Sequence, residues 1–156
     1  MAGYSPKSLA DKLGLKAVRK DGQGRKALFI SPPSDYPDTL GPHPKLGLKL
    51  EVDTAKALSK VVSKKGPFDF IQAFCREDEA LVALFPALKA MLAPDGMAWI
   101  SWPKQGKTKP LPGALTENRI REIGLKAGLV DVKVCAVDET WSGLKFVLRL
   151  KDRPKA

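Results

Sequence analysis

Residues 68–101 decide the fold, and they read FDFIQAFCREDEALVALFPALKAMLAPDGMAWIS. Residues 68–74 form an almost continuous apolar run, which is typical of a strand buried on both faces. Apolar residues then recur at helical spacing behind an acidic start, at Leu81, Leu84, Phe85, Leu88 and Leu92. A turn at Pro94-Asp95-Gly96 precedes a second buried strand over 97–102. The stretch therefore predicts a strand, a helix and a parallel strand, and Pro86 is expected to kink or restart the helix.

The chain upstream predicts the same alternation of strands and helices. Residues 27–30 are a short apolar strand that ends at Ser31-Pro32-Pro33, and residues 48–52 are a weaker strand. A helix capped by Asp53 or Thr54 then runs to Lys64-Lys65. Near the start of the chain, the sequence favours a short helix over residues 5–14, because Pro suits a first helical position and Gly a helix end.

Downstream, Thr116 caps a predicted helix that ends at Gly128. Residues 130–137 and 144–150 then alternate apolar and polar side chains, and a short connection over 138–143 joins them. Period-two alternation across a short connection indicates an antiparallel strand pair.

Strands that alternate with helices imply right-handed crossovers and a parallel sheet with helices on both faces. The sequence thus predicts a three-layer, Rossmann-like α/β fold whose mostly parallel sheet ends in an antiparallel strand pair. This ending, together with the pattern over residues 68–101, resembles the class I methyltransferases. We expect a single methyltransferase-like domain over residues 1–150 and a basic tail over residues 151–156.

Composition excludes several kinds of protein. The 156 residues are 44% hydrophobic and 28% charged, so the chain is too apolar to be disordered, and no apolar run approaches the ~20 residues of a membrane span. Two cysteines, Cys75 and Cys135, and one histidine, His43, argue against a disulfide scaffold, a metal site and a Ser-His-Asp triad. Nothing at the N-terminus suggests export, so we expect a cytoplasmic protein without a membrane partner.

The chain carries 27 basic and 17 acidic residues, a formal charge of +10. Such an excess favours attraction to nucleic acid or other polyanions. One basic cluster, Lys104, Lys107 and Lys109, contains no acidic residue, and we refer to these three side chains as the loop lysines. No nucleic-acid-binding motif accompanies them, so nucleic acid is retained as an alternative partner.

A methyltransferase would need a glycine-rich turn after its first strand, because the amino-acid end of its cofactor packs against bare backbone there. This sequence has Pro32 and Pro33 at that place, and they remove N–H donors and add bulk. We therefore expect the two prolines to close the mouth of the pocket. No cofactor is predicted, with S-adenosylmethionine kept as an alternative, and no catalytic residue is assigned.

Ligands of open parallel sheets bind beyond the carboxyl ends of the strands. Polar and aromatic side chains follow these ends or join the last two strands, and we predict that they form a rim for a small ligand or a protein partner. This rim consists of Ser31, Tyr36, Ser101, Trp102, Lys104, Asp138 and Trp141. Trp99 and Trp102 should face opposite sides of one strand. An alternative is that Trp141 only plugs the end of the sheet and that Asp138 or Thr140 bonds the turn backbone.

Three stretches resemble a specific group, the bacterial domain-of-unknown-function family 3052. They are GYS with LADKLG near the start, SWPK over 101–104, and GLVDVKVCAVDETWSGLK over 128–145. The resemblance implies a small cytoplasmic bacterial protein and brings no established activity or cofactor. Residues 18–26 depart from the compact Pro-Gly turn of the relatives and are richer in charge.

The leading hypothesis is a non-catalytic domain with a methyltransferase-like scaffold that binds a ligand or partner through the rim. A second hypothesis is an S-adenosylmethionine-dependent methyltransferase with a divergent cofactor site. A third is an electrostatic nucleic-acid-binding protein without chemistry of its own, whose affinity would fall steeply with salt.

Overall fold

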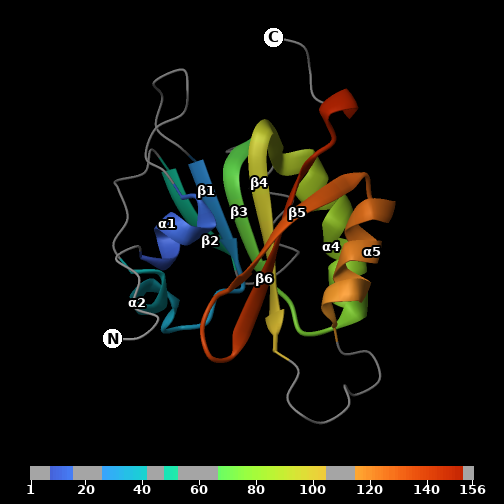
Figure 1. Ribbon diagram of the computed structural model, residues 1–156. Coiled ribbons are helices and arrows are strands. Elements are labelled where there is room, and N and C mark those ends of the chain that lie inside the picture. The colour runs from blue at the N-terminus through green and yellow to red at the C-terminus, as the bar shows by residue number, and fades with distance from the viewer. Residues whose placement is uncertain (1–7, 16–25, 42–47, 53–66, 105–114, 153–156) are drawn as a thin grey trace.

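The computed structural model describes residues 8–15, 26–41, 48–52, 67–104 and 115–152. Within these residues, six strands form one sheet in the order β2-β1-β3-β4-β6-β5 (Figure 1). The strands are β1 Lys26–Ile30, β2 Leu48–Val52, β3 Phe68–Phe74, β4 Leu92–Pro103, β5 Leu129–Ala136 and β6 Trp141–Leu148. The helices are α1 Leu9–Leu13, α2 Tyr36–Leu40, α4 Asp78–Met91 and α5 Glu117–Lys126, and a 3-10 turn spans Leu150–Asp152.

The strand directions confirm the predicted fold class. The pairs β1–β2, β1–β3 and β3–β4 are parallel. β6 lies between β4 and β5 and runs antiparallel to both. The last two strands therefore close the sheet as an antiparallel pair, with β5 at its edge.

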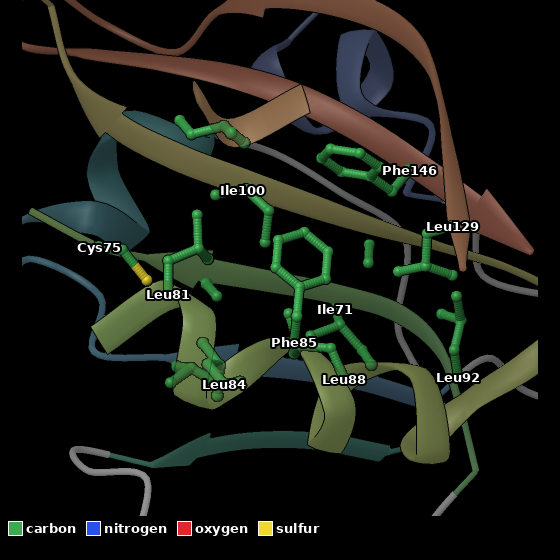
Figure 2. Close-up of a cluster of buried hydrophobic side chains, with 14 of the residues drawn as sticks. Ile71, Cys75, Leu81, Leu84, Phe85, Leu88, Leu92, Ile100, Leu129 and Phe146 are labelled. Carbon is green, nitrogen blue, oxygen red and sulfur yellow. The ribbon is translucent and has the colours of Figure 1, made fainter. Parts of the chain in front are cut away.

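Helices cover both faces of the sheet, with α1 and α2 on one side and α4 and α5 on the other (Figure 1). Alternate residues of β3 serve the two sides, since Phe70 and Phe74 pack with α1 and α2 whereas Ile71 and Ala73 pack toward α4. Figure 2 shows the larger core, in which Phe85 of α4 meets Phe146 of β6 edge to face, with ring centroids 5.2 Å apart. Burial on both faces explains why β3 is apolar along almost its whole length.

Local signals set several boundaries as expected. Thr116 caps α5 by accepting a hydrogen bond from the Arg119 backbone N–H, and Gly128 follows the helix with a φ of 99°. Gly14, with a φ of 83°, ends α1. Trp99 and Trp102 belong to the two opposite cores, as their spacing predicts.

Three boundaries differ from the sequence-based expectation. α4 is one helix that continues through the exposed Pro86, so the helix does not restart there. β4 already begins at Leu92, and the expected turn at Pro94-Asp95-Gly96 is part of the strand. A Cβ at Gly96 would lie 3.0 Å from the carbonyl oxygens of both Phe68 and Asp69, so the glycine serves a close strand contact there. Trp141 opens β6 and does not lie in the connection before it.

The expected helix after Asp53, the first residues of the expected helix over 5–14 and most of the basic tail lie outside the described residues. Among the residues that are described, no helix is long and apolar enough to cross a membrane.

The parallel register brings the ends of four strands to one edge of the sheet. Ile30 of β1 is level with Val52 of β2 and Ala73 of β3, and Phe74 is level with Ser101 of β4. The start of β6 reaches the same place, since Trp141 pairs with Pro103. We call this boundary the carboxyl edge.

Candidate functional site

A cavity of about 430 Å³ lies at the carboxyl edge, between the ends of β1 and β3 and the first turns of α4. We call it the edge cavity. Its described lining residues are Ile30, Ser31, Pro33, Phe74, Cys75, Arg76, Glu77, Ala80, Leu84 and Trp141. The expectation that Pro32 and Pro33 close this edge is therefore wrong, because Pro33 forms part of the wall of an existing cavity.

The turn after β1 explains how two prolines leave room. Ser31 has a φ of 54°, in the left-handed region that glycine usually occupies, so the chain turns sharply one residue before the prolines. Its backbone N–H donates to the Val52 carbonyl at 2.7 Å, and the Pro33 carbonyl accepts from the Tyr36 N–H at 3.0 Å. The turn therefore begins the short α2 directly, although its prolines offer no N–H to a ligand.

Arg76 and Trp141 form the most distinctive pair in the wall of the cavity. The Arg76 guanidinium carbon lies 4.9 Å from the centroid of the Trp141 ring, a cation–π contact. Trp141 is only 6% exposed, and its ring meets Phe74 edge to face at 5.1 Å. The Trp141 ring, on which the Arg76 guanidinium lies, is therefore held in place by its packing within the protein.

The loop before β6 sets the position of Trp141. One carboxylate oxygen of Asp138 accepts from the backbone N–H groups of Thr140 and Trp141, each at 2.8 Å. The Trp141 carbonyl in turn accepts from the N–H groups of Val137 and Asp138. Asp138 thus bonds the turn backbone, as the second interpretation of this connection predicted. It is not a lining residue of the cavity, and its role there is to position Trp141.

Cys75 places a thiol at the boundary between the cavity and the larger core, close to Leu81 (Figure 2). Burial raises the pKa of this thiol from its ordinary 9.0 to about 11. The group is therefore a protonated thiol at neutral pH, which suits packing and not nucleophilic attack.

Two of the predicted rim residues, Tyr36 and Ser101, are buried in the interior. The Tyr36 hydroxyl donates to the Gln72 side-chain carbonyl, and the Gln72 amide donates to the Ser101 hydroxyl at 3.0 Å. All three side chains are buried, and burial raises the pKa of Tyr36 far above its ordinary value. The side-chain amide of Gln72 therefore provides a hydrogen-bond partner for both hydroxyls. Neither Tyr36 nor Ser101 lines the edge cavity.

The remaining predicted rim residues are divided by the structure. Ser31 and Trp141 line the edge cavity. Trp102 is 4% exposed and belongs to the core under α4 and α5. It is not a rim residue, because at its position in β4 the side chain faces this core. Lys104 is exposed, and its N–H donates to the Thr140 carbonyl at 2.7 Å. The other two loop lysines lie outside the described residues.

Sequence reasoning missed Arg76 and Glu77 as part of the site. The available signal was their position directly after a buried strand, at the edge where ligands of parallel sheets bind. The sequence analysis used the acidic residues after this strand only as the start of a helix. In the part of the chain that is described, no cluster of His, Cys, Asp and Glu could hold a metal ion.

No protein-family model matches the chain, and no curated protein matches it in sequence. Solved structures do resemble it in fold. A SAM-dependent methyltransferase from Aquifex aeolicus has a TM-score of 0.57 and 16% identity, over 88% of this chain and 86% of its own. A TehB-like SAM-dependent methyltransferase from Corynebacterium glutamicum has a TM-score of 0.55 and 14% identity, over 95% of this chain and 91% of its own.

Fibrillarin from Aeropyrum pernix, solved with natively bound S-adenosyl-L-methionine, has a TM-score of 0.57 and 14% identity, over 89% of this chain and 73% of its own. Together these neighbours show that the chain has the Rossmann-like fold of the class I SAM-dependent methyltransferases. The narrower resemblance to domain-of-unknown-function family 3052 stays a prediction, since no family model matches.

Proposed function

We propose that the protein binds a small organic ligand in the edge cavity and uses its methyltransferase-like scaffold as a binding domain. The observation that carries this proposal is the cavity itself. Its volume of about 430 Å³ lies within the range of roughly 300–1,000 Å³ that ligand pockets occupy. It also lies at the carboxyl ends of parallel strands, where open α/β sheets bind their ligands.

The chemistry of the wall supports binding more than methyl transfer. Pro32 and Pro33 stand where a methyltransferase needs backbone N–H donors, and the Ser31 N–H is used by the Val52 carbonyl. Cys75 is a protonated thiol at neutral pH, and burial, which raises its pKa to about 11, disfavours the thiolate further. The described part of the wall is mainly apolar, with one guanidinium and one carboxylate, a composition typical of a ligand pocket.

Filling the cavity tests the proposal. Ala80, exposed in the first turn of α4, lines the cavity, so the Ala80→Phe variant places a ring in it without breaking the helix. Ala90 is also exposed on α4, about 15 Å further along the helix axis, and the Ala90→Phe variant is the matched control. The probes are S-adenosylmethionine, S-adenosylhomocysteine and a panel of organic acids, nucleosides and nucleotides, followed by thermal shift and calorimetry.

We expect at least one probe to stabilise the wild type and the Ala90→Phe variant, and to lose its effect in the Ala80→Phe variant. Binding that survives in Ala80→Phe would place the ligand elsewhere and would refute the proposal. A complete lack of stabilisation by the panel, with no small molecule copurifying with the native protein, would also refute it.

Methyl transfer is the second candidate, and one local feature favours it. Ser31 adopts the left-handed φ of 54° after the first strand, at the turn where a methyltransferase places glycine. The solved neighbours are SAM-dependent methyltransferases, which makes S-adenosylmethionine a reasonable ligand for the same edge. Micromolar binding of S-adenosylmethionine together with release of S-adenosylhomocysteine in the presence of an acceptor would replace the binding role with this one.

A further inference from the structure

The arginine of the edge cavity differs from the other arginines that the structure describes. Arg119 pairs with Asp78 and Glu122, and Arg121 pairs with Glu117 and Asp131. Arg149 donates to the Leu125 carbonyl. Within the described part of the chain, no carboxylate lies within ion-pair distance of Arg76, whose guanidinium rests on the Trp141 ring. Its N–H donors are therefore available to a molecule in the cavity.

The contact with Trp141 prepares Arg76 for such a molecule. A guanidinium stacked on an indole keeps its in-plane N–H groups free while its position is restricted. Trp141 cannot move easily, because Phe74 packs on its ring and Asp138 holds its backbone. The conformational entropy that an arginine loses when it binds an anion is thus already partly lost in the unliganded protein.

Trp141 itself also carries a donor, its indole N–H. Among the described residues, no acceptor lies within hydrogen-bonding distance of its indole N–H, which is not fully buried. An indole nitrogen can only donate, so its natural partner is an oxygen acceptor. Much of the wall is apolar, and its apolar part includes Ile30, Pro33, Leu84 and the ring of Phe74.

We infer that the ligand of the edge cavity is an amphipathic organic molecule with a singly charged oxyanion, a carboxylate or a phosphodiester, that binds Arg76 above Trp141 and places its apolar body against Ile30, Pro33 and Leu84. This inference rests on the proposed function of the cavity. Arginine suits both oxyanions, because its planar fork donates two parallel hydrogen bonds to either.

A single charge follows from the acidic residues near the cavity. Glu77 lies in the wall, and its carboxylate would repel a doubly charged ligand more strongly than a singly charged one. Asp78 is engaged by Arg119, which lowers the pKa of this carboxyl through a hydrogen bond and keeps its charge paired. Among the described residues of its wall, the cavity therefore offers one uncommitted positive group, Arg76, and one negative group, Glu77.

Matched probes separate recognition of charge from recognition of shape. Aryl and alkyl carboxylates are compared with primary amides of the same skeleton, and cyclic AMP is compared with adenosine, by ligand-observed NMR and calorimetry. The first arm tests carboxylates and the second tests phosphodiesters. Variants are Arg76→Gln and Arg76→Lys, and Arg149→Gln is the control because it removes the same charge away from the cavity.

We expect an anionic probe to bind about tenfold more tightly than its neutral partner, which corresponds to about 1.4 kcal/mol. Arg76→Gln should abolish this preference, Arg76→Lys should restore part of it, and Arg149→Gln should leave it unchanged. If acids and amides bind equally well, or if Arg76→Gln keeps the preference, the inference is wrong while cavity binding stands. If no probe of either charge binds, both the inference and the proposed function are overturned.

Discussion

Cys75 is a titratable residue that belongs both to the larger core and to the wall of the edge cavity. Its pKa is raised from 9.0 to about 11 because the thiolate is poorly solvated in the folded state. The folded protein therefore holds a proton that the unfolded chain releases above pH 9, and this contribution to stability is lost as the pH rises from 9 toward 11.

Replacement of Cys75 by alanine should remove this pH dependence. Between pH 9 and 11, the free energy of unfolding should fall in both proteins. We expect the fall in the wild type to exceed the fall in the Cys75→Ala variant by about 2 kcal/mol. Urea unfolding at several pH values measures the stability of the two proteins. Tyr36, whose pKa is also raised, contributes the same pH dependence to each. Parallel pH profiles would show that the thiol is not shielded from water in the folded protein.

Gly124 permits a close contact between α5 and the sheet in the larger core. A Cβ at this position would overlap the ring of Phe146, which is fully buried. Alanine is the better helix former by roughly 1 kcal/mol, yet overpacking of a rigid core costs typically 1–3 kcal/mol. We expect Gly124→Ala to lower the free energy of unfolding in urea by up to about 2 kcal/mol, which is the difference of these effects.

The neighbouring Leu125→Ala variant is the control for Gly124→Ala, since Leu125 is 39% exposed on the same helix. It should change stability by less than about 0.5–1 kcal/mol. A Gly124→Ala protein that is more stable than the wild type would mean that Phe146 moves aside at little cost.

At the scale of elements, α1 depends on the sheet for its existence. Five residues are too few for an isolated helix. The Trp99 indole N–H donates to the Leu13 carbonyl at 2.8 Å, and Ala10 and Leu13 are fully buried. One side chain of β4 therefore holds the end of a helix 86 residues earlier in the chain.

Trp99→Phe should release α1. The variant leaves the buried Leu13 carbonyl without its donor, which costs about 1–3 kcal/mol in addition to the smaller ring. Relative to the wild type, amide hydrogen exchange should accelerate more in residues 8–15 than in β3. Met97→Leu, which changes a side chain that touches Gly14 and removes no hydrogen bond, is the control. Equal acceleration of exchange throughout the sheet would indicate a general loss of stability and no specific anchor.

Local patterns predicted the elements well and their long-range placement less well. The apolar run of β3, the cap at Thr116 and the glycine at 128 are signals that neighbours in sequence create. The position of β6 between β4 and β5 is a tertiary arrangement, so the sequence indicated only an antiparallel pair. The start of β4 at Leu92 was missed because Pro94-Asp95-Gly96 has the composition of a turn.

The candidate site was predicted in part for the same reason. Ser31 follows β1 and Trp141 begins β6 at the carboxyl edge, and both line the cavity. Tyr36 and Ser101 were misplaced because their partner Gln72 lies on a third element. A polar side chain near an edge can turn inward when another buried polar group satisfies it, and no local pattern reveals that partner.

For the whole molecule, the edge cavity joins elements that are distant in sequence. Its wall combines the ends of β1 and β3, the start of α4 and the start of β6. A ligand that contacts all four binds the folded state only, so it stabilises the protein by mass action, by about 2.7 kcal/mol at a concentration one hundred times its dissociation constant. Thermal shift is therefore a sensitive measurement for the proposed function.

The net charge of +10 is also a property of the whole molecule, and it predicts weak attraction to nucleic acid that depends on salt. We propose that the loop lysines are its main contacts, because no acidic residue interrupts them. Binding through phosphates releases counterions, so the logarithm of the affinity falls linearly with the logarithm of the salt concentration.

Replacing all three loop lysines by glutamine should reduce that slope for duplex DNA by about two to three, since each phosphate contact contributes about 0.9. Fluorescence anisotropy between 50 and 200 mM salt measures the slope, in the range where the effect on affinity is large. The matched control replaces Lys126, Lys133 and Lys151, which are exposed elsewhere, and removes the same charge. An equal change in both triple variants would assign the attraction to the overall field of the protein, and affinity that does not change with salt would exclude an electrostatic contact altogether.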